Sequence, residues 1–185
     1  MKKLIALFFA VLLLCLSFTA CTPKEKVVSA PGDTSGIAVN GVYDETLGKT
    51  VMLGMKKAAV DKVLGAPIEE GKGTAGSQNF LYNNGLSVDF KDGIVYSILV
   101  TEEAVQCKIS YSVAIGADLE TLPAAFSKDL GANLGRVAYY GADYTSVDVL
   151  LDAAFQVMLR TDPETQKVTS IYIMSIAQSN VGDAE

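Results

Sequence analysis

Two stretches decide the fold: Val51-Met-Leu-Gly-Met-Lys-Lys-Ala-Ala-Val-Asp-Lys-Val-Leu-Gly-Ala-Pro67 and Phe80-Leu-Tyr-Asn-Asn-Gly-Leu-Ser-Val-Asp-Phe-Lys-Asp-Gly-Ile-Val-Tyr-Ser-Ile-Leu-Val100. In the first, apolar residues three and four positions apart predict a short amphipathic helix. The helix should end where Gly65 can take a left-handed conformation, and Pro67 prevents it from resuming. In the second, alternating residues around Asp92-Gly93 predict two strands joined by a tight hairpin turn.

The same pattern recurs further along the chain. Leu64-Gly65 aligns with Leu130-Gly131, and residues 95–98 align with residues 168–171. A stripe at helical spacing predicts a second helix, and it consists of Leu119, Leu122, Phe126 and Leu130. Strands are expected at residues 107–115, 136–140, 145–151, 154–161 and 167–175. The matches predict two related subdomains, residues 46–104 and 105–177, unless two α+β segments share Gly, Val and Ala by chance.

The N-terminus has the organisation of a secretion signal. Two lysines precede the apolar run 4–16, which is shorter than the roughly 20 residues of a transmembrane helix. Small residues then precede Cys21, and this arrangement resembles the processing motif of bacterial lipoproteins, in which the cysteine is acylated. We expect residues 1–20 to be a signal peptide, Cys21 to carry lipid outside the cytoplasm, and residues 21–45 to form a polar linker. An ordinary signal peptide with an incidental cysteine is the alternative.

The charge of the chain argues against nucleic acid as a partner. The full chain carries 15 basic and 21 acidic residues, a formal charge of −6. Removal of residues 1–20 discards two lysines, so 13 basic and 21 acidic residues would remain, and 13 − 21 gives −8. A polyanion would be repelled by this excess of acid. The expected membrane attachment is therefore the lipid at Cys21.

Residue chemistry favours a protein without catalytic activity. The chain has no histidine, the most frequent general base and a common metal ligand, so we expect no metal site and no cofactor. Cys107 would be the one cysteine left after processing and acylation, and it is expected to be a buried small hydrophobe without a disulfide partner. The adjacent acids Glu69-Glu70 and Glu102-Glu103 leave one alternative open, a histidine-independent hydrolase acting through carboxylates.

Strand alternation predicts a binding surface in the second subdomain. If Ile171, Ile173, Phe155, Val157 and Leu159 face the core, their neighbours must face outward. The outward set, which we predict to bind a ligand, consists of Gln156, Met158, Arg160, Tyr172 and Met174. Tyr, Met and Arg are enriched at binding surfaces. The alternative is that the other subdomain covers this face.

The repeat itself resembles a known structural unit. Residues 53–67, followed by Val88-Asp-Phe-Lys-Asp-Gly-Ile-Val95, are similar to the repeat of the beta-lactamase-inhibitor-protein-like (BLIP-like) fold and of SmpA/OmlA-type envelope lipoproteins. The resemblance implies an α+β fold of two tandem repeats, each with short helices on one face of an antiparallel β-meander, before a loose tail at residues 178–185. It implies a lipid-anchored module that binds a protein or cell-wall component; inhibition of a beta-lactamase is an alternative.

Overall fold

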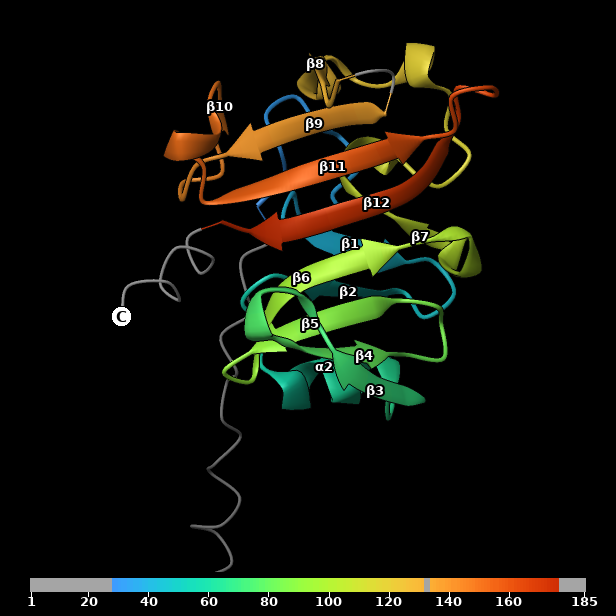
Figure 1. Ribbon diagram of the computed structural model, residues 1–185, viewed down its shortest axis with the longest axis vertical. Coiled ribbons are helices and arrows are strands. Elements are labelled where there is room, and N and C mark those ends of the chain that lie inside the picture. Colours follow the sequence, from blue (N-terminus) through green and yellow to red (C-terminus); the bar gives the residue numbers. More distant parts are fainter. Residues whose placement is uncertain (1–27, 132–133, 177–185) are drawn as a thin grey trace, which may run out of the picture.

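The structure is a computed structural model that describes residues 28–131 and 134–176. This part of the chain is α+β, with one α-helix and two antiparallel sheets (Figure 1). The helix α2 spans Lys57–Leu64. The strands are β1 (Gly41–Asp44), β2 (Lys49–Met52), β3 (Glu69–Lys72), β4 (Gln78–Leu81), β5 (Ser87–Lys91), β6 (Ile94–Val100), β7 (Cys107–Lys108), β8 (Lys128–Asp129), β9 (Gly135–Tyr140), β10 (Ser146–Val147), β11 (Phe155–Thr161) and β12 (Val168–Ser175).

The large sheet is continuous across the two predicted subdomains. Its strand order is β10-β9-β11-β12-β6-β5-β4-β3, with β8 added beside β9. The junction is the antiparallel pair of β6 and β12, in which Leu99 lies opposite Tyr172. A smaller sheet has the order β2-β1-β7, and in Figure 1 it lies behind the large sheet, as α2 does. Among the described residues, neither α2 nor the small sheet covers the front face of the large sheet, which we call the open face (Figure 1).

The core lies between the large sheet and the elements behind it. A cross-strand row of buried side chains runs from Val88 through Ile98 and Ile173 to Val157, and each of the four has 0% exposure. Phe155, Leu159 and Ile171 are buried as well. Because successive residues of a strand point to opposite faces, the residues between these must face the open side. The predicted alternation of β11 and β12 is confirmed.

The first helix and the hairpin are confirmed. The helix α2 buries Val60, and its last turn is closed by a hydrogen bond from the Gly65 amide to the Asp61 carbonyl. Gly65 has φ of 86°, a backbone conformation that residues with a side chain rarely adopt. Asp92 and Gly93 both have positive φ, 52° and 74°, as a tight turn of this hairpin type requires.

The predicted second helix is wrong. The stripe that begins at Leu119 folds into two 3₁₀ turns, η4 (Leu119–Thr121) and η5 (Ala124–Phe126), joined by extended backbone. The reason is Pro123, which disfavours helical backbone at the residue before it. Leu122 accordingly has φ of −62° and ψ of 143°. Only Phe126 of the stripe is fully buried, against the ring of Tyr111.

Two predicted strands are much shorter than expected. The region 107–115 forms a narrow hairpin in which Lys108 bridges Ala114 around the turn η3 (Ser110–Ser112). Tyr111 and Ser112 in this turn both have φ of 58°, which a strand cannot accommodate. The region 145–151 keeps only the two residues of β10 before the turn η6 (Leu150–Asp152) begins. The second predicted subdomain therefore contains less regular strand than the sequence pattern predicts.

The folded region starts before the predicted boundary at residue 46. Ala38, Val39 and Val42 are almost completely buried, and β1 lies in the middle of the small sheet. The linker prediction of 21–45 therefore extends too far, because these apolar residues pack into the core. The predicted signal peptide, Cys21 and the tail 178–185 lie outside the described residues. Within the described ranges, no helix has the length and apolarity needed to span a membrane.

Candidate functional site

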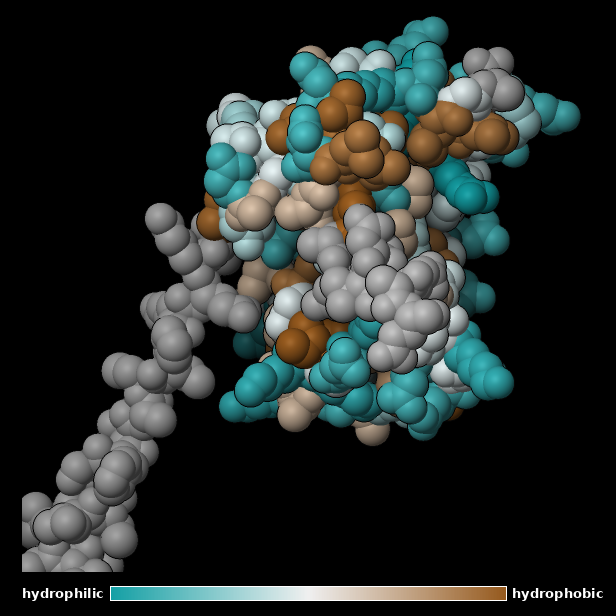
Figure 2. Space-filling model, turned by 60° about the vertical axis from the view of Figure 1, so that its left-hand side comes forward, coloured by the Kyte–Doolittle hydropathy of each residue, from teal (hydrophilic) through white to brown (hydrophobic). Residues whose placement is uncertain are grey.

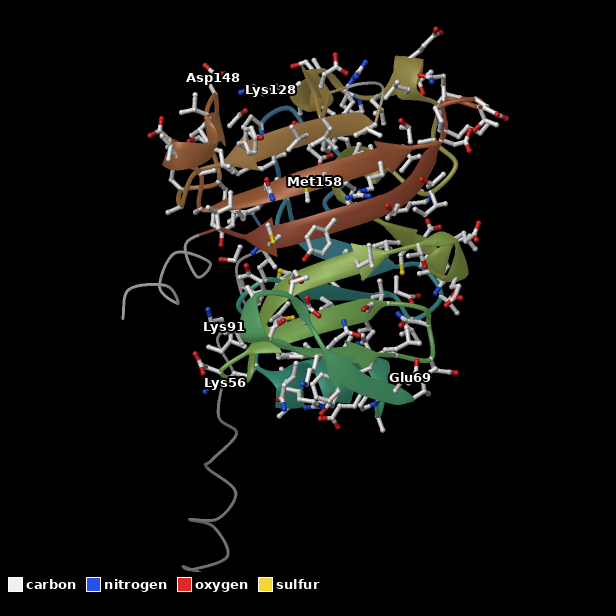
Figure 3. The ribbon with its side chains drawn as sticks, in the orientation of Figure 1. Lys56, Glu69, Lys91, Lys128, Asp148 and Met158 are labelled. Carbon is white, nitrogen blue, oxygen red and sulfur yellow. The ribbon has the colours of Figure 1, made fainter. Side chains whose placement is uncertain are left out.

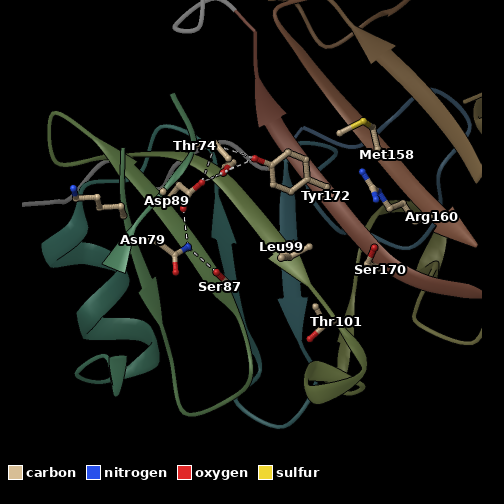
Figure 4. Close-up of a pocket in the computed structure, with 13 residues that line it drawn as sticks. Thr74, Asn79, Ser87, Asp89, Leu99, Thr101, Met158, Arg160, Ser170 and Tyr172 are labelled. Carbon is tan, nitrogen blue, oxygen red and sulfur yellow. Dashed lines mark hydrogen bonds between the residues drawn. The ribbon is translucent and has the colours of Figure 1, made fainter. Parts of the chain in front are cut away.

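The large sheet has a first half, β3 to β6, and a second half, β8 to β12, which meet where β6 pairs with β12. The open face of the sheet contains a groove at this junction. We call it the junction groove; its volume is about 620 Å³. From the first half it is lined by Lys72, Gly73, Thr74, Asn79, Ser87, Asp89, Ser97, Leu99 and Thr101, and from the second by Met158, Arg160, Ser170 and Tyr172. Figure 4 shows Met158 and Arg160 on one side of Tyr172, with Asn79 and Asp89 on the other. The groove therefore draws its side chains from both halves of the sheet.

Strand register explains which residues meet in the junction groove. Met158 lies opposite Tyr172, and Tyr172 lies opposite Leu99, so these three form one row across β11, β12 and β6. Arg160 lies opposite Ser170 in a neighbouring row. Ser97, Thr101 and Ser170 on or beside the central strands also line the groove.

The predicted binding residues divide into two groups. Met158, Arg160 and Tyr172 line the junction groove, and Figure 3 shows Met158 on the open face. Gln156 lies opposite Met174 on the same face, but neither lines the groove. Gln156 is only 8% exposed. The groove is thus displaced from the predicted surface towards β6 and β5, and the first half contributes most of its lining.

A buried carboxylate organises the wall formed by the first half. Asp89 is 5% exposed, and it accepts hydrogen bonds from Asn79 Nδ2 at 2.7 Å, Ser97 Oγ at 2.8 Å and Thr74 Oγ1 at 3.2 Å. Asn79 also donates to Ser87 Oγ at 2.7 Å. Several donors compensate a carboxylate for the water that it loses on burial. This network holds β4, β5 and β6 in a common arrangement beneath the groove.

Tyr172 connects the two halves through its hydroxyl group. The hydroxyl donates to Ser97 Oγ at 3.2 Å and lies 3.4 Å from Thr74 Oγ1. Thr74 comes from the turn η1 (Thr74–Gly76) between β3 and β4. That turn packs closely over Asp89, because a Cβ at Gly73 would come within 2.6 Å of the Asp89 carboxylate. The ring of Tyr172 is therefore fixed at its outer end, and its half-exposed side faces the groove.

The charged lining of the junction groove is cationic. Lys72 and Arg160 are both exposed, and neither takes part in an ion pair with another residue of 28–131 or 134–176. Among the described lining residues, the one carboxylate is that of Asp89, which is buried beneath its hydrogen-bond donors. In a chain with a formal charge of −6, this is a local excess of accessible positive charge.

The residues considered for catalysis lie elsewhere. Glu69 and Glu70 are exposed on the edge strand β3, Glu102 and Glu103 are exposed in the turn η2 (Glu102–Ala104), and none of them lines the groove. Cys107 is fully buried, as predicted. Burial and the nearby Asp44 carboxylate raise the pKa of its thiol to about 12, so the reactive thiolate is scarce at neutral pH. Across the described ranges, no cluster of three or more metal-ligating side chains occurs.

A separate hydrophobic surface lies at the turn η6. Val149, Leu150 and Leu151 are exposed, and Leu151 is 96% accessible. Figure 2 shows a group of hydrophobic side chains in the upper part of the molecule, with hydrophilic ones above it and to its left. The flanking acids Asp148 and Asp152 are also exposed. This surface belongs to the loop between β10 and β11 and has no residue in common with the junction groove.

Comparison with known proteins shows only a weak structural likeness. No protein-family model matches the chain, and no curated protein does. One solved structure, a cysteine-rich secretory protein from Staphylococcus aureus subsp. aureus Mu50, aligns with 14% identity and a TM-score of 0.47, covering 68% of this chain and 44% of its own. An extracellular protein containing a SCP domain from Bacillus anthracis str. Ames aligns with 13% identity and a TM-score of 0.47, covering 68% and 45%.

These findings correct the resemblance drawn from the repeat. The structures that align are described as secretory and SCP-domain proteins, not as BLIP-like repeats or envelope lipoproteins of the SmpA/OmlA type. The matching residues were cap, turn and core positions, which many α+β proteins share for reasons of folding alone. The expectation of beta-lactamase inhibition loses its basis with the resemblance. The match spans less than half of either solved chain, and at this TM-score it carries no argument about a ligand.

Proposed function

We propose that this protein is a non-catalytic, extracytoplasmic binding module that holds a protein or cell-wall component in the junction groove. The observation that carries the proposal is the composition of the groove, in which hydroxyl, amide, aromatic and cationic side chains from both halves converge on about 620 Å³. A concave site with a few converging polar groups is the usual form of a ligand site. The buried Asp89 network and the fixed Tyr172 hydroxyl favour binding because they organise the site before a ligand arrives.

Lipid anchoring at Cys21 is part of the same proposal. It is supported by the apolar run 4–16 and the small residues before the cysteine. Cys21→Ser should abolish acylation, so the variant should leave the detergent phase when cell extracts are partitioned in Triton X-114, or remain as the longer unprocessed precursor. Identical partitioning and identical size for the variant and the parent would contradict the lipid anchor.

We further propose that the two halves of the large sheet are a degenerate internal repeat. The alignment of residues 95–98 with residues 168–171 makes Leu99 and Tyr172 equivalent, and these two residues lie opposite each other at the junction. If a two-fold axis relates the two halves, that axis passes between Leu99 and Tyr172. In this arrangement the junction groove lies on the axis, where the two copies have diverged into different side chains.

The functional proposal is tested by retention on envelope material. Purified full-length protein is mixed with washed insoluble cell walls and, separately, with immobilised envelope proteins. Tyr172→Ala and Arg160→Ala should each weaken retention about thirtyfold or more, the effect of losing about 2 kcal/mol at an energetic anchor. Lys56→Ala removes an equal charge far from the groove (Figure 3). This variant should be retained on the envelope material to the same extent as the parent protein. Unchanged retention in both groove variants, with their melting temperatures preserved, would contradict the proposal.

A further inference from the structure

We propose that the ligand of the junction groove is an acidic saccharide, a chain of hydroxylated sugar rings that carries carboxylate groups. This inference rests on the proposed function, and it adds the chemical class of the ligand. It follows from three properties of the groove: its charge, its supply of free hydroxyl groups and the pairing of its backbone.

The charge of the groove selects an anionic group. The Arg160 guanidinium lies beside Met158 and Tyr172 (Figure 4), and no ion pair joins it to another described residue. Arginine presents a planar fork of donors that matches a carboxylate in two parallel hydrogen bonds. Asp89 does not compete for it, because Asn79 and Ser97 already hold that carboxylate at 2.7 Å and 2.8 Å. An incoming carboxylate is therefore the matching partner for Arg160.

The hydroxyl groups of the groove suit the rest of a sugar ring. Thr101 and Ser170 line the groove near Arg160, and neither side chain makes a hydrogen bond within residues 28–131 and 134–176. Each hydroxyl can donate one hydrogen bond and accept others, which is the capacity that a polyhydroxylated ligand also has. Leu99, Met158 and Tyr172 provide an apolar row between these polar groups, on which the C–H face of a ring can pack.

The backbone of the groove disfavours an extended peptide. The strands β5, β6 and β12 at its floor each have a paired neighbour on both sides, so their backbone amides and carbonyls are used within the sheet. A peptide that adds to a sheet as a strand needs an unpaired edge. Recognition in this groove must come from side chains, and the accessible polar ones carry hydroxyl, amide, guanidinium and ammonium groups.

The inference is tested by calorimetric titration of the full-length protein with three probes. These are galacturonate oligosaccharides, the same oligosaccharides as methyl esters, and oligo-glutamate of equal charge. We expect the acid form to bind at least tenfold more tightly than the ester, and oligo-glutamate to bind more weakly than the acid. Arg160→Gln should remove the difference between acid and ester, whereas Lys56→Gln should preserve it.

Each result has a distinct consequence. Equal or tighter binding of oligo-glutamate would overturn the saccharide in favour of an acidic peptide. Binding of the acid form that Arg160→Gln leaves unchanged would place the saccharide outside the groove and contradict the inference. If no probe binds while cell-wall retention still depends on Tyr172, the saccharide class is wrong and the proposed function stands. If no probe binds and cell-wall retention does not depend on Tyr172 either, both the saccharide class and the proposed function are contradicted.

Discussion

Phe126→Ala is expected to lower the free energy of unfolding by about 3–5 kcal/mol, the usual cost of emptying a buried phenylalanine site. Phe126 is 2% exposed, and its ring meets Tyr111 edge to face at 6.2 Å between centroids. The 3₁₀ turn that carries it is short, so few neighbours can move in to fill the space. Urea denaturation followed by far-ultraviolet circular dichroism measures the change.

Leu130→Ala is the matched control for this prediction. A regular helix over the stripe would bury Leu130 and Phe126 alike, whereas here Leu130 is only half-buried. Its truncation should therefore cost clearly less than that of Phe126. Equal losses at the two sites would indicate that the stripe packs as a helix after all, and a loss below about 0.5 kcal/mol at Phe126 would mean that this ring is not in the core.

Gly135→Ala is expected to destabilise the protein by about 2–5 kcal/mol, and it is expected to be the most severe glycine substitution in the described chain. An added Cβ would stand only 1.8 Å from the backbone carbonyl oxygen of Leu159, and Gly135 has φ of 134°. Overpacking costs about 1–3 kcal/mol, and left-handed backbone adds about 1–2 kcal/mol for a residue with a side chain. The neighbouring atoms are backbone and cannot rotate away. Because Gly135 pairs with Arg160 across β9 and β11, the substitution should also weaken ligand retention.

Gly71→Ala provides the comparison for Gly135. Gly71 lies in the edge strand β3, its φ is ordinary, and no atom lies within 4 Å of an added Cβ. Thermal melting should show a change within about 0.5 kcal/mol for this variant. If Gly135→Ala melts at the same temperature as Gly71→Ala, the close approach of β9 and β11 at that point is wrong.

Local sequence signals predicted the elements whose geometry depends on a few adjacent residues. The turn at Asp92-Gly93 requires two residues that tolerate positive φ, and both are present. The end of α2 requires a glycine, and Gly65 is in the right place. The alternation in β11 and β12 identified the buried and outward faces correctly, because burial of Ile171 and Ile173 leaves only one arrangement.

The second helix was predicted wrongly, and the part of the site formed by the first half of the sheet was not predicted. The spacing of Leu119 and Phe126 matches a helix, but Pro123 between them forces extended backbone at Leu122. Three of the five predicted binding residues, Met158, Arg160 and Tyr172, line the junction groove. The first half of the site was missed because β6 and β12 are distant in sequence, and their pairing cannot be seen from local periodicity.

The sequence does contain a signal for the groove residues of the first half that were not predicted. Ser87, Asp89 and Ser97 are polar positions on strands whose alternate residues are strongly apolar, so alternation places all three on the open face. Asp89 in particular stands between Val88 and Phe90, where a solvent-exposed acid would be unremarkable. Its burial depends on donors from Asn79 and Thr74, and only the folded sheet brings these to it.

The central claim, that the junction groove is the binding site, is tested most directly by filling it. Ser170 lines the groove on β12, and a tryptophan at this position would occupy the space while suiting a strand. Thr169 is its exposed neighbour on the same strand but outside the groove lining. In the cell-wall retention assay, Ser170→Trp should lose retention at least tenfold with its melting temperature preserved, and Thr169→Trp should retain as the parent does. Full retention by a folded Ser170→Trp variant would contradict the account.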